Sequence, residues 1–254
     1  LLADAAATLN FTADAAEYSA LADEIRQAFR KRFVREGTLS SDTQTAYALA
    51  LCFDLLDPGE RSMAGARLVE LVREANHTIT TGFVGTPIIL DALVLAGALG
   101  DAYDVLFQTE CPSWLYPVHM GATTIWERWD SLQPDGQVNP GEMTSFNHYA
   151  FGAVASWMHR TLGGLAPSEP GYRRIRIAPR PDPRIDSVRV AHTTPFGTAS
   201  VDWEYQQDIW RVSAVVPPGT TAVVSLSPDT AEFEVGPGSH EWLVPSPDKA
   251  EHEK

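Results

Sequence analysis

The sequence predicts an α+β chain of two domains, an all-helical part followed by an antiparallel β-sandwich. Three observations predict this class. Up to residue 162, apolar residues recur at helical spacing. From residue 175 onward they alternate with polar residues, as in Ile175/Ile177 and Val201/Trp203/Tyr205. A Pro- and Gly-rich linker, Ala166–Gly171, separates the two patterns. We therefore expect domains at residues 1–165 and 171–245, and a disordered, charged tail at 246–254.

The first helices follow from apolar spacing and from turn residues. A stripe within a charged segment predicts an amphipathic helix with one buried face, formed by Tyr18, Ala22, Ile25, Phe29 and Phe33. Ser41 and Asp42 are expected to cap a second helix, and Asp57-Pro58-Gly59 to turn the chain into a third. The inward positions expected for these two helices are Tyr47, Ala48, Leu51, Cys52, Leu55, Ala64, Leu68, Leu71 and Val72.

A loop bounded by glycines, Thr81–Pro87, precedes a helix over Ile88–Leu99 that is apolar on nearly every face. Thr86 is expected to cap this helix and Pro87 to occupy its first position, which explains the loop as a turn without chemistry. Alternation of amphipathic and all-apolar helices suits a barrel of two concentric rings. The last strong helix is expected over Ser145–Leu162, with Phe151, Val154, Ala155 and Met158 facing inward.

Two indoles and two carboxylates lie within the five residues Trp126-Glu127-Arg128-Trp129-Asp130. This combination suits a sugar site, because aromatic rings stack on the apolar faces of a sugar while carboxylates accept its protons. The alternative is structural, with the tryptophans in the core and Glu127 and Arg128 forming a buried ion pair.

A second polar pair, Asn147-His148, lies in the segment Glu142–Val154, which is expected to open the last helix. We expect this pair at the mouth of a cavity. The alternative is a structural histidine whose hydrogen bonds are satisfied within the fold.

Taken in order, four segments of the chain resemble the bacterial α-L-rhamnosidases of glycoside hydrolase family 78. They are Thr81–Pro87, Gly121–Asp130, Glu142–Val154 and Gly171-Tyr172-Arg173-Arg174-Ile175-Arg176-Ile177-Ala178-Pro179. The resemblance implies part of an (α/α)₆ barrel followed by a β-sandwich. It also implies inverting hydrolysis of terminal α-L-rhamnosides without a cofactor or metal.

The resemblance assigns roles to individual residues. Glu127 matches the general base, and His148 matches a residue that lines the rhamnose pocket. Trp126 and Trp129 are neighbours of that pocket, and Asp130 is expected to orient Arg128 or a sugar hydroxyl. Nothing in residues 1–80 resembles the family's acidic motif, so the general acid is expected to be missing from this chain. Residues 1–165 provide about half the helices of such a barrel, so we expect a C-terminal portion that begins within a domain.

The composition narrows the choice of partners. A net charge of −14 opposes binding to nucleic acid or to an anionic membrane, and no apolar run is long enough to span a bilayer. Cys52 and Cys111 imply no disulfide framework. The first residues lack the features of a signal peptide, and the sequence predicts no compartment. Half a barrel would expose apolar helix faces, which we expect a second copy or the preceding half of the same polypeptide to cover.

Two rival functions remain open. In one, the chain is a non-catalytic carbohydrate-binding or scaffolding fragment. In the other, His119, Glu127 and His148 bind a metal, although no compact ligand motif is present.

Overall fold

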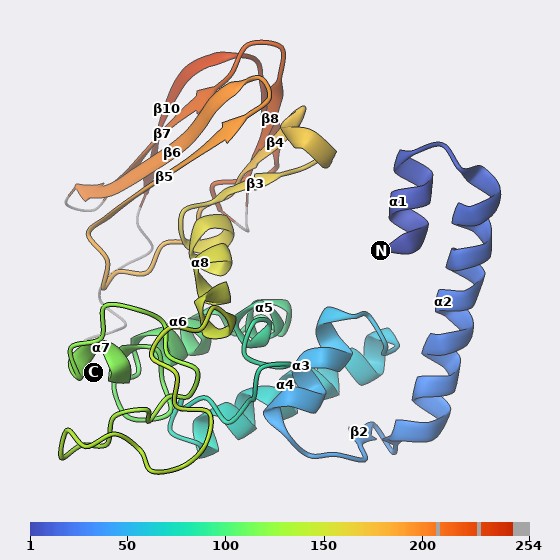
Figure 1. Cartoon of the computed structure of the whole chain (residues 1–254). Coiled ribbons are helices and arrows are strands. Elements are labelled where there is room, and N and C mark those ends of the chain that lie inside the picture. Colours follow the sequence, from blue (N-terminus) through green and yellow to red (C-terminus); the bar gives the residue numbers. More distant parts are fainter. Residues whose placement is uncertain (207–208, 228–229, 246–254) are drawn as a thin grey trace. The chain divides into compact units, whose positions relative to one another are not determined.

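The computed structural model describes residues 1–206, 209–227 and 230–245. They form two compact units that divide between Val154 and Ala155. The first unit is helical and the second is built from two four-stranded sheets, in the order that the sequence predicts (Figure 1). The tail expected at residues 246–254 lies outside the described residues.

The first unit contains seven α-helices, a two-stranded ribbon and the start of a last helical segment. The helices are α1 (Leu2–Thr8), α2 (Thr12–Phe33), α3 (Gln44–Cys52), α4 (Pro58–Glu74), α5 (Ile89–Leu95), α6 (Leu99–Phe107) and α7 (Leu115–His119). The ribbon pairs β1 (Val34–Arg35) with β2 (Thr38–Leu39). The last helical segment runs through η1 (Ala150–Ala153), α8 (Val154–Trp157) and η2 (Met158–Leu162).

Helix α2 forms where its apolar spacing predicts, but the prediction that its apolar stripe is buried was wrong. No residue of α2 is buried, and Ile25 is 54% exposed. The helix is attached to the rest of the unit by its arginines, because Arg30 binds Glu60 at 2.8 Å and also pairs with Asp57. Periodicity identifies the apolar face of a helix, whereas burial requires a packing partner that local sequence does not supply.

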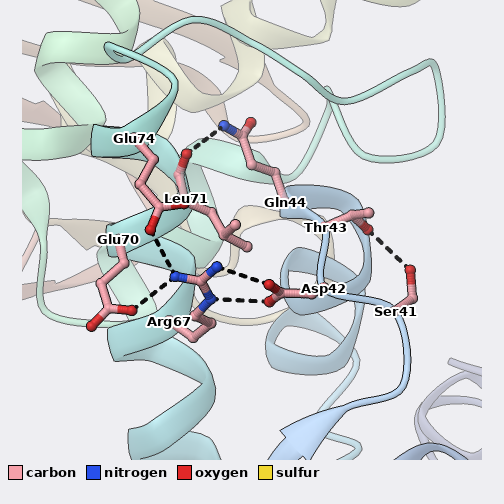
Figure 2. Close-up of polar contacts among 8 residues, drawn as sticks. All are labelled: Ser41, Asp42, Thr43, Gln44, Arg67, Glu70, Leu71 and Glu74. Carbon is pink, nitrogen blue, oxygen red and sulfur yellow. Dashed lines mark hydrogen bonds and ion pairs between the residues drawn. The ribbon is translucent and has the colours of Figure 1, made fainter.

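Helices α3 and α4 form the predicted hairpin, with a different cap on α3. The hydroxyl of Thr43, rather than Ser41 or Asp42, accepts the hydrogen bond from Ala46 N that caps the helix. Asp42 instead binds Arg67 of α4 through both carboxylate oxygens, at 2.8 and 3.0 Å (Figure 2). The Arg67 guanidinium also contacts Glu70 and Glu74, each at 3.0 Å.

The core of this hairpin agrees with the predicted inward faces. Seven apolar residues of the two helices are buried, and all but Ala50 are among the predicted ones, namely Tyr47, Ala48, Ala50, Leu51, Ala64, Leu68 and Val72. Three further predicted positions, Cys52, Leu55 and Leu71, are half-buried.

The predicted helix over Ile88–Leu99 is divided in two. Helix α5 ends at Leu95 and α6 begins at Leu99, with Gly97 between them at a φ of +76°, a conformation that favours glycine. Thr86 does not cap α5, because its hydroxyl binds Thr81 Oγ1 at 2.8 Å and the Gly82 carbonyl at 2.9 Å.

The last helix also begins later than predicted, at Ala150 instead of Ser145. The preceding residues use their backbone groups elsewhere, since His148 N donates to Ile125 O and Ser145 O accepts from Glu127 N. Phe151 is buried as predicted, but Ala155 and Met158 are exposed.

In the second unit, one sheet has the strand order β10-β7-β6-β5 and the other β3-β4-β8-β9. The strands are β3 (Leu165–Pro167), β4 (Arg174–Ile177), β5 (Ser187–Thr194), β6 (Gly197–Gln206), β7 (Ile209–Val216), β8 (Thr221–Val224), β9 (Phe233–Val235) and β10 (Gly238–Pro245), and the short helix η3 (Pro170–Tyr172) precedes β4. Among the described strands, β4 and β8 form the one parallel pair, which the sequence did not predict. The predicted alternation is observed, because Ile175, Ile177, Val201 and Trp203 are buried.

Two further expectations concern the whole chain. Neither Cys52 nor Cys111 forms a disulfide bond within the described part of the chain. Across the part of the chain that the structure describes, no helix combines the length and the apolar character that a membrane span requires.

Candidate active site

The two polar segments singled out in the sequence lie side by side as irregular backbone. Glu127 N donates to Ser145 O and His148 N donates to Ile125 O, both at 2.8 Å. The Thr124 hydroxyl adds a bond to the Phe146 carbonyl. These contacts place Glu127 and His148 on neighbouring segments of the backbone.

Glu127 lines a cavity of about 450 Å³ within the first unit. The cavity wall is formed by Thr81, Gly82, Phe83, Glu127, Arg128, Trp129, Asp130, Glu142, Met143 and Phe151. The Glu127 carboxylate accepts one hydrogen bond, from Ser145 N at 3.2 Å. It has no ion pair within the described residues. The buried Glu127–Arg128 ion pair considered from the sequence is therefore not formed, and the carboxylate retains free lone pairs for a molecule in the cavity.

Arg128 pairs instead with Asp130, for which the sequence left open contact with Arg128 or with a sugar hydroxyl. Its Nε and Nη2 lie 2.6 and 3.2 Å from the two carboxylate oxygens of Asp130. Asn139 Nδ2 donates to Asp130 at 2.8 Å, and Arg128 Nη1 donates to the Glu142 carbonyl. Both carboxylate oxygens of Asp130 are thus occupied, and Arg128 is held against the wall of the cavity.

The two tryptophans of the motif have different surroundings. Trp129 lines the Glu127 cavity and stacks on Phe151, with ring centroids 3.8 Å apart and planes 3° apart. Trp126 is 4% exposed, packs edge-on against Phe146, and does not line that cavity. It lines a second, mostly apolar cavity of about 270 Å³, whose wall also includes Trp129 and Phe151. Trp129 therefore lies in the wall of the Glu127 cavity, whereas Trp126 is buried as a core residue would be.

His148 lines a neighbouring cavity of about 600 Å³ together with Phe83 and Tyr149. Its imidazole stacks on the Phe83 ring, with centroids 5.1 Å apart and planes 10° apart. The imidazole Nδ1 accepts a hydrogen bond from Ala150 N at 3.3 Å. Of the expected pair, His148 thus lines a cavity, whereas Asn147 lines neither this cavity nor that of Glu127. His148 Nε2 makes none of the hydrogen bonds found among the described residues.

Phe83 is the site residue that the sequence interpretation missed. It lines both the cavity of Glu127 and the cavity of His148. Its loop was interpreted as a turn without chemistry, because glycines and a cap explained each residue type. The available signal was a bulky aromatic residue between two glycines, in a segment that already contributed to the family resemblance.

The metal site considered from the sequence, with His119, Glu127 and His148 as ligands, is not formed among the described residues. Among the described residues, the one group of three side chains that could share a metal ion is His77, Asp101 and Asp104, so His119, Glu127 and His148 do not converge. Asp101 already receives two hydrogen bonds from Arg73, at 2.7 and 2.8 Å. These bonds, and a weaker one from His77, hold the pKa of Asp101 below its usual value. A cation at this group would have to compete with the Arg73 guanidinium.

The comparison of the sequence with known families decides the classification. Residues 1–162 match the family described as the bacterial alpha-L-rhamnosidase 6 hairpin glycosidase domain. Residues 164–241 match the bacterial alpha-L-rhamnosidase C-terminal domain. The chain belongs to the bacterial α-L-rhamnosidase family. The predicted fold class, part of an (α/α)₆ barrel followed by a β-sandwich domain, is thereby confirmed.

Curated relatives and solved structures agree with this classification. The chain is 40% identical over 250 residues to an α-L-rhamnosidase of Streptomyces avermitilis, covering 91% of this chain and 24% of the relative. A second relative, from Formosa agariphila, is 38% identical over 234 residues and is covered to 25%. The chain thus spans about a quarter of the length of these curated α-L-rhamnosidases.

The structural likeness extends over nearly the whole chain. The crystal structure of native α-L-rhamnosidase from Aspergillus terreus superposes with a TM-score of 0.92 at 40% identity, over 95% of this chain and 28% of that one. The Streptomyces avermitilis α-L-rhamnosidase complexed with L-rhamnose gives a TM-score of 0.89 at 38% identity, over 95% and 25% of the two chains.

Proposed function

We propose that this chain carries the base-bearing side of an active site that hydrolyses terminal α-L-rhamnosides with inversion. The observation that carries the proposal is the Glu127 carboxylate, which lines a cavity, accepts a single backbone hydrogen bond and has no ion pair within the described residues. The α-L-rhamnosidase names of the relatives, and the L-rhamnose in one solved complex, support the choice of sugar.

In the proposed reaction, Glu127 takes a proton from a water molecule as the oxygen of that water attacks the anomeric carbon. The attack comes from the face opposite the departing aglycone, so the configuration inverts. Arg128, held by Asp130, donates hydrogen bonds to sugar hydroxyls, and Trp129 and His148 bound the pocket. Trp126 supports this wall from the core rather than contacting the sugar.

We propose that the general acid comes from residues outside this chain. Inverting enzymes hold their two carboxyl groups about 6.5–9.5 Å apart, on opposite sides of the sugar. Asp130 is committed to Arg128 and Asn139, and it belongs to the same segment as Glu127. The chain matches 24% of the length of one curated relative, so the general acid of such a polypeptide can lie in the part that this chain does not match. We accordingly expect the 254-residue chain alone to bind L-rhamnose without hydrolysing an aryl rhamnoside.

Glu127→Gln in the full-length protein that carries this chain tests the proposal. We expect kcat on 4-nitrophenyl α-L-rhamnopyranoside to fall at least about 100-fold, because removing a general base costs about 10²–10⁴. Glu142→Gln is the matched control, since Glu142 lines the same cavity and the charge change is identical. Proton NMR of the first product should show β-L-rhamnose. Near-normal turnover by Glu127→Gln, or a first product of α configuration, would contradict the mechanism.

The domain ranges remain part of the proposal. We propose a catalytic-barrel part at residues 1–165 and a β-sandwich at 171–245, the latter without catalytic residues. We propose a structural role for the β-sandwich, since Trp203 and Trp210 are buried and offer no ring face to a sugar. A non-catalytic carbohydrate-binding or scaffolding fragment remains the alternative. Turnover by the full-length protein that is lost in Glu127→Gln would favour the enzyme.

A further inference from the structure

Phe83 occupies a position that neither the family resemblance nor the proposed reaction assigns. It is the residue that lines both the cavity of Glu127 and the cavity of His148. A sugar that occupies both cavities would therefore pass Phe83, the one residue that their walls share.

The Phe83 ring is held in place from two sides. The His148 imidazole stacks on it, with ring planes 10° apart. The Phe151 ring lies on another side, with its centroid 5.1 Å from that of Phe83 and its plane tilted by 44°. The loop beneath is pinned by the hydrogen bond between Thr81 and Thr86. A ring fixed in this way cannot turn aside to admit a polar group, so it can discriminate between substrates.

The other apolar residues of the Glu127 cavity are less suited to this role. Trp129 and Phe151 are stacked on one another, with ring centroids 3.8 Å apart, and of these two cavities they line only that of Glu127. Phe151 is also 5% exposed, and Met143 is 57% exposed at the rim. Phe83 is half-buried and forms part of both cavity walls.

The cavity wall has charged and apolar parts. Its charged residues are Glu127, Arg128, Asp130 and Glu142, whereas Phe83, from the loop before α5, adds an apolar ring without hydrogen-bonding groups. L-rhamnose has the same division, with hydroxyls on its ring and a methyl group at C6 in place of a hydroxymethyl group. A hydroxyl pressed against the Phe83 ring would lose its hydration without gaining a partner.

We infer that Phe83 is a specificity-determining residue that receives the C6 methyl group of the sugar and disfavours sugars with a hydroxyl at C6. The inference rests on the proposed function. It deepens that function by naming the 6-deoxy character of the substrate as the feature that this side chain recognises.

The test compares kcat/KM for 4-nitrophenyl α-L-rhamnopyranoside and 4-nitrophenyl α-L-mannopyranoside, which differ only by the C6 hydroxyl. An apolar contact discriminates against an added hydroxyl by about 100-fold. In the full-length protein we expect Phe83→Ala to lower the rhamnoside-to-mannoside ratio about 10-fold or more, and Phe83→Leu to lower it by about threefold or more. Phe53→Ala is the control, because Phe53 is 58% exposed and lines neither cavity. Its ratio should match that of the wild type.

Thermal unfolding of each variant establishes that it is folded, and Phe83→Leu decides the test if Phe83→Ala does not fold. A ratio within twofold of the wild type in the folded Phe83 variants would overturn this inference and leave the proposed function intact. A wild-type protein that hydrolyses neither substrate would overturn the proposed function, and this inference with it.

Discussion

Glu127 and Ser145 are joined by two hydrogen bonds of opposite direction. The amide of Glu127 donates to the Ser145 carbonyl at 2.8 Å, and the amide of Ser145 donates to Glu127 Oε2 at 3.2 Å. The first bond fixes the backbone at Glu127 and the second fixes its carboxylate. The orientation of the proposed base therefore depends on a residue that has no catalytic chemistry of its own.

Removing the Ser145 amide should impair turnover more than removing its hydroxyl. Proline has no N–H, so Ser145→Pro abolishes the bond to Glu127 Oε2. A hydrogen bond to a charged group contributes about 1.5–3 kcal/mol, which predicts a fall in kcat of roughly 10- to 100-fold. Ser145→Ala keeps the amide and loses only the hydroxyl contacts to Asn147, so its kcat should stay within about threefold. Equal losses in the two variants, measured on an aryl rhamnoside, would show that the amide is not what orients Glu127.

Gly141→Ala should disturb Arg128. A Cβ at this position would lie 2.7 Å from Arg128 Nη1 and 3.0 Å from Asn139 Oδ1. Asp130 and the Glu142 carbonyl hold the guanidinium, so it cannot move without losing hydrogen bonds. We expect KM for the rhamnoside to rise about 3- to 30-fold with a smaller change in kcat, because Arg128 is proposed to bind substrate hydroxyls. Gly59→Ala is the control, since nothing lies within 4 Å of its added Cβ. A KM that stays at the wild-type value in Gly141→Ala would remove Arg128 from the binding site.

The bond between Asp101 and Arg73 should make stability depend on acid pH. Arg73 holds the pKa of Asp101 below its unfolded value of about 3.9, so the ionised form stabilises the folded state. This contribution is complete above pH 3.9 and is lost as the pH falls through the lower, folded pKa. Asp101→Asn should reduce the free energy of unfolding at pH 7 by about 1.5–3 kcal/mol.

Urea denaturation at pH 7 and near pH 3 measures this effect. The difference between wild type and Asp101→Asn should be smaller at the lower pH. Glu110→Gln, at an exposed position, should change neither value by more than about 0.5 kcal/mol. A difference that is independent of pH would indicate that Asp101 acts through packing and not through its charge.

Leu21→Ala and Leu68→Ala compare the same substitution on two helices. Leu68 in α4 is fully buried, and its truncation should cost about 2–5 kcal/mol. Leu21 in α2 is 47% exposed, and its truncation should cost less than about 1 kcal/mol in this chain. Chemical denaturation of the 254-residue chain gives both values. A cost at Leu21 close to that at Leu68 would mean that α2 is packed on its apolar side in solution.

Much of the secondary structure was predictable because it depends on local spacing. The helical period of Tyr47, Ala48 and Leu51 and the alternation of Val201 and Trp203 both identified buried faces correctly. The helix boundaries were less predictable. Thr43 caps α3 in place of Ser41 or Asp42, since Asp42 is drawn to Arg67 on another helix. Asp42 meets Arg67 only once α3 and α4 are packed together, so the local sequence could not predict this partner.

The candidate site was likewise predictable only in part. A run of indoles and carboxylates around Glu127, in order with the neighbouring motifs, was enough to predict a sugar-handling family and a base. The pairing of Glu127 with Ser145, the placement of Phe83 beside His148 and the withdrawal of Trp126 into the core depend on residues distant in the chain. Residue types and their spacing predict the kind of chemistry and the secondary structure. Which side chains share a cavity is decided only when segments distant in the sequence fold together.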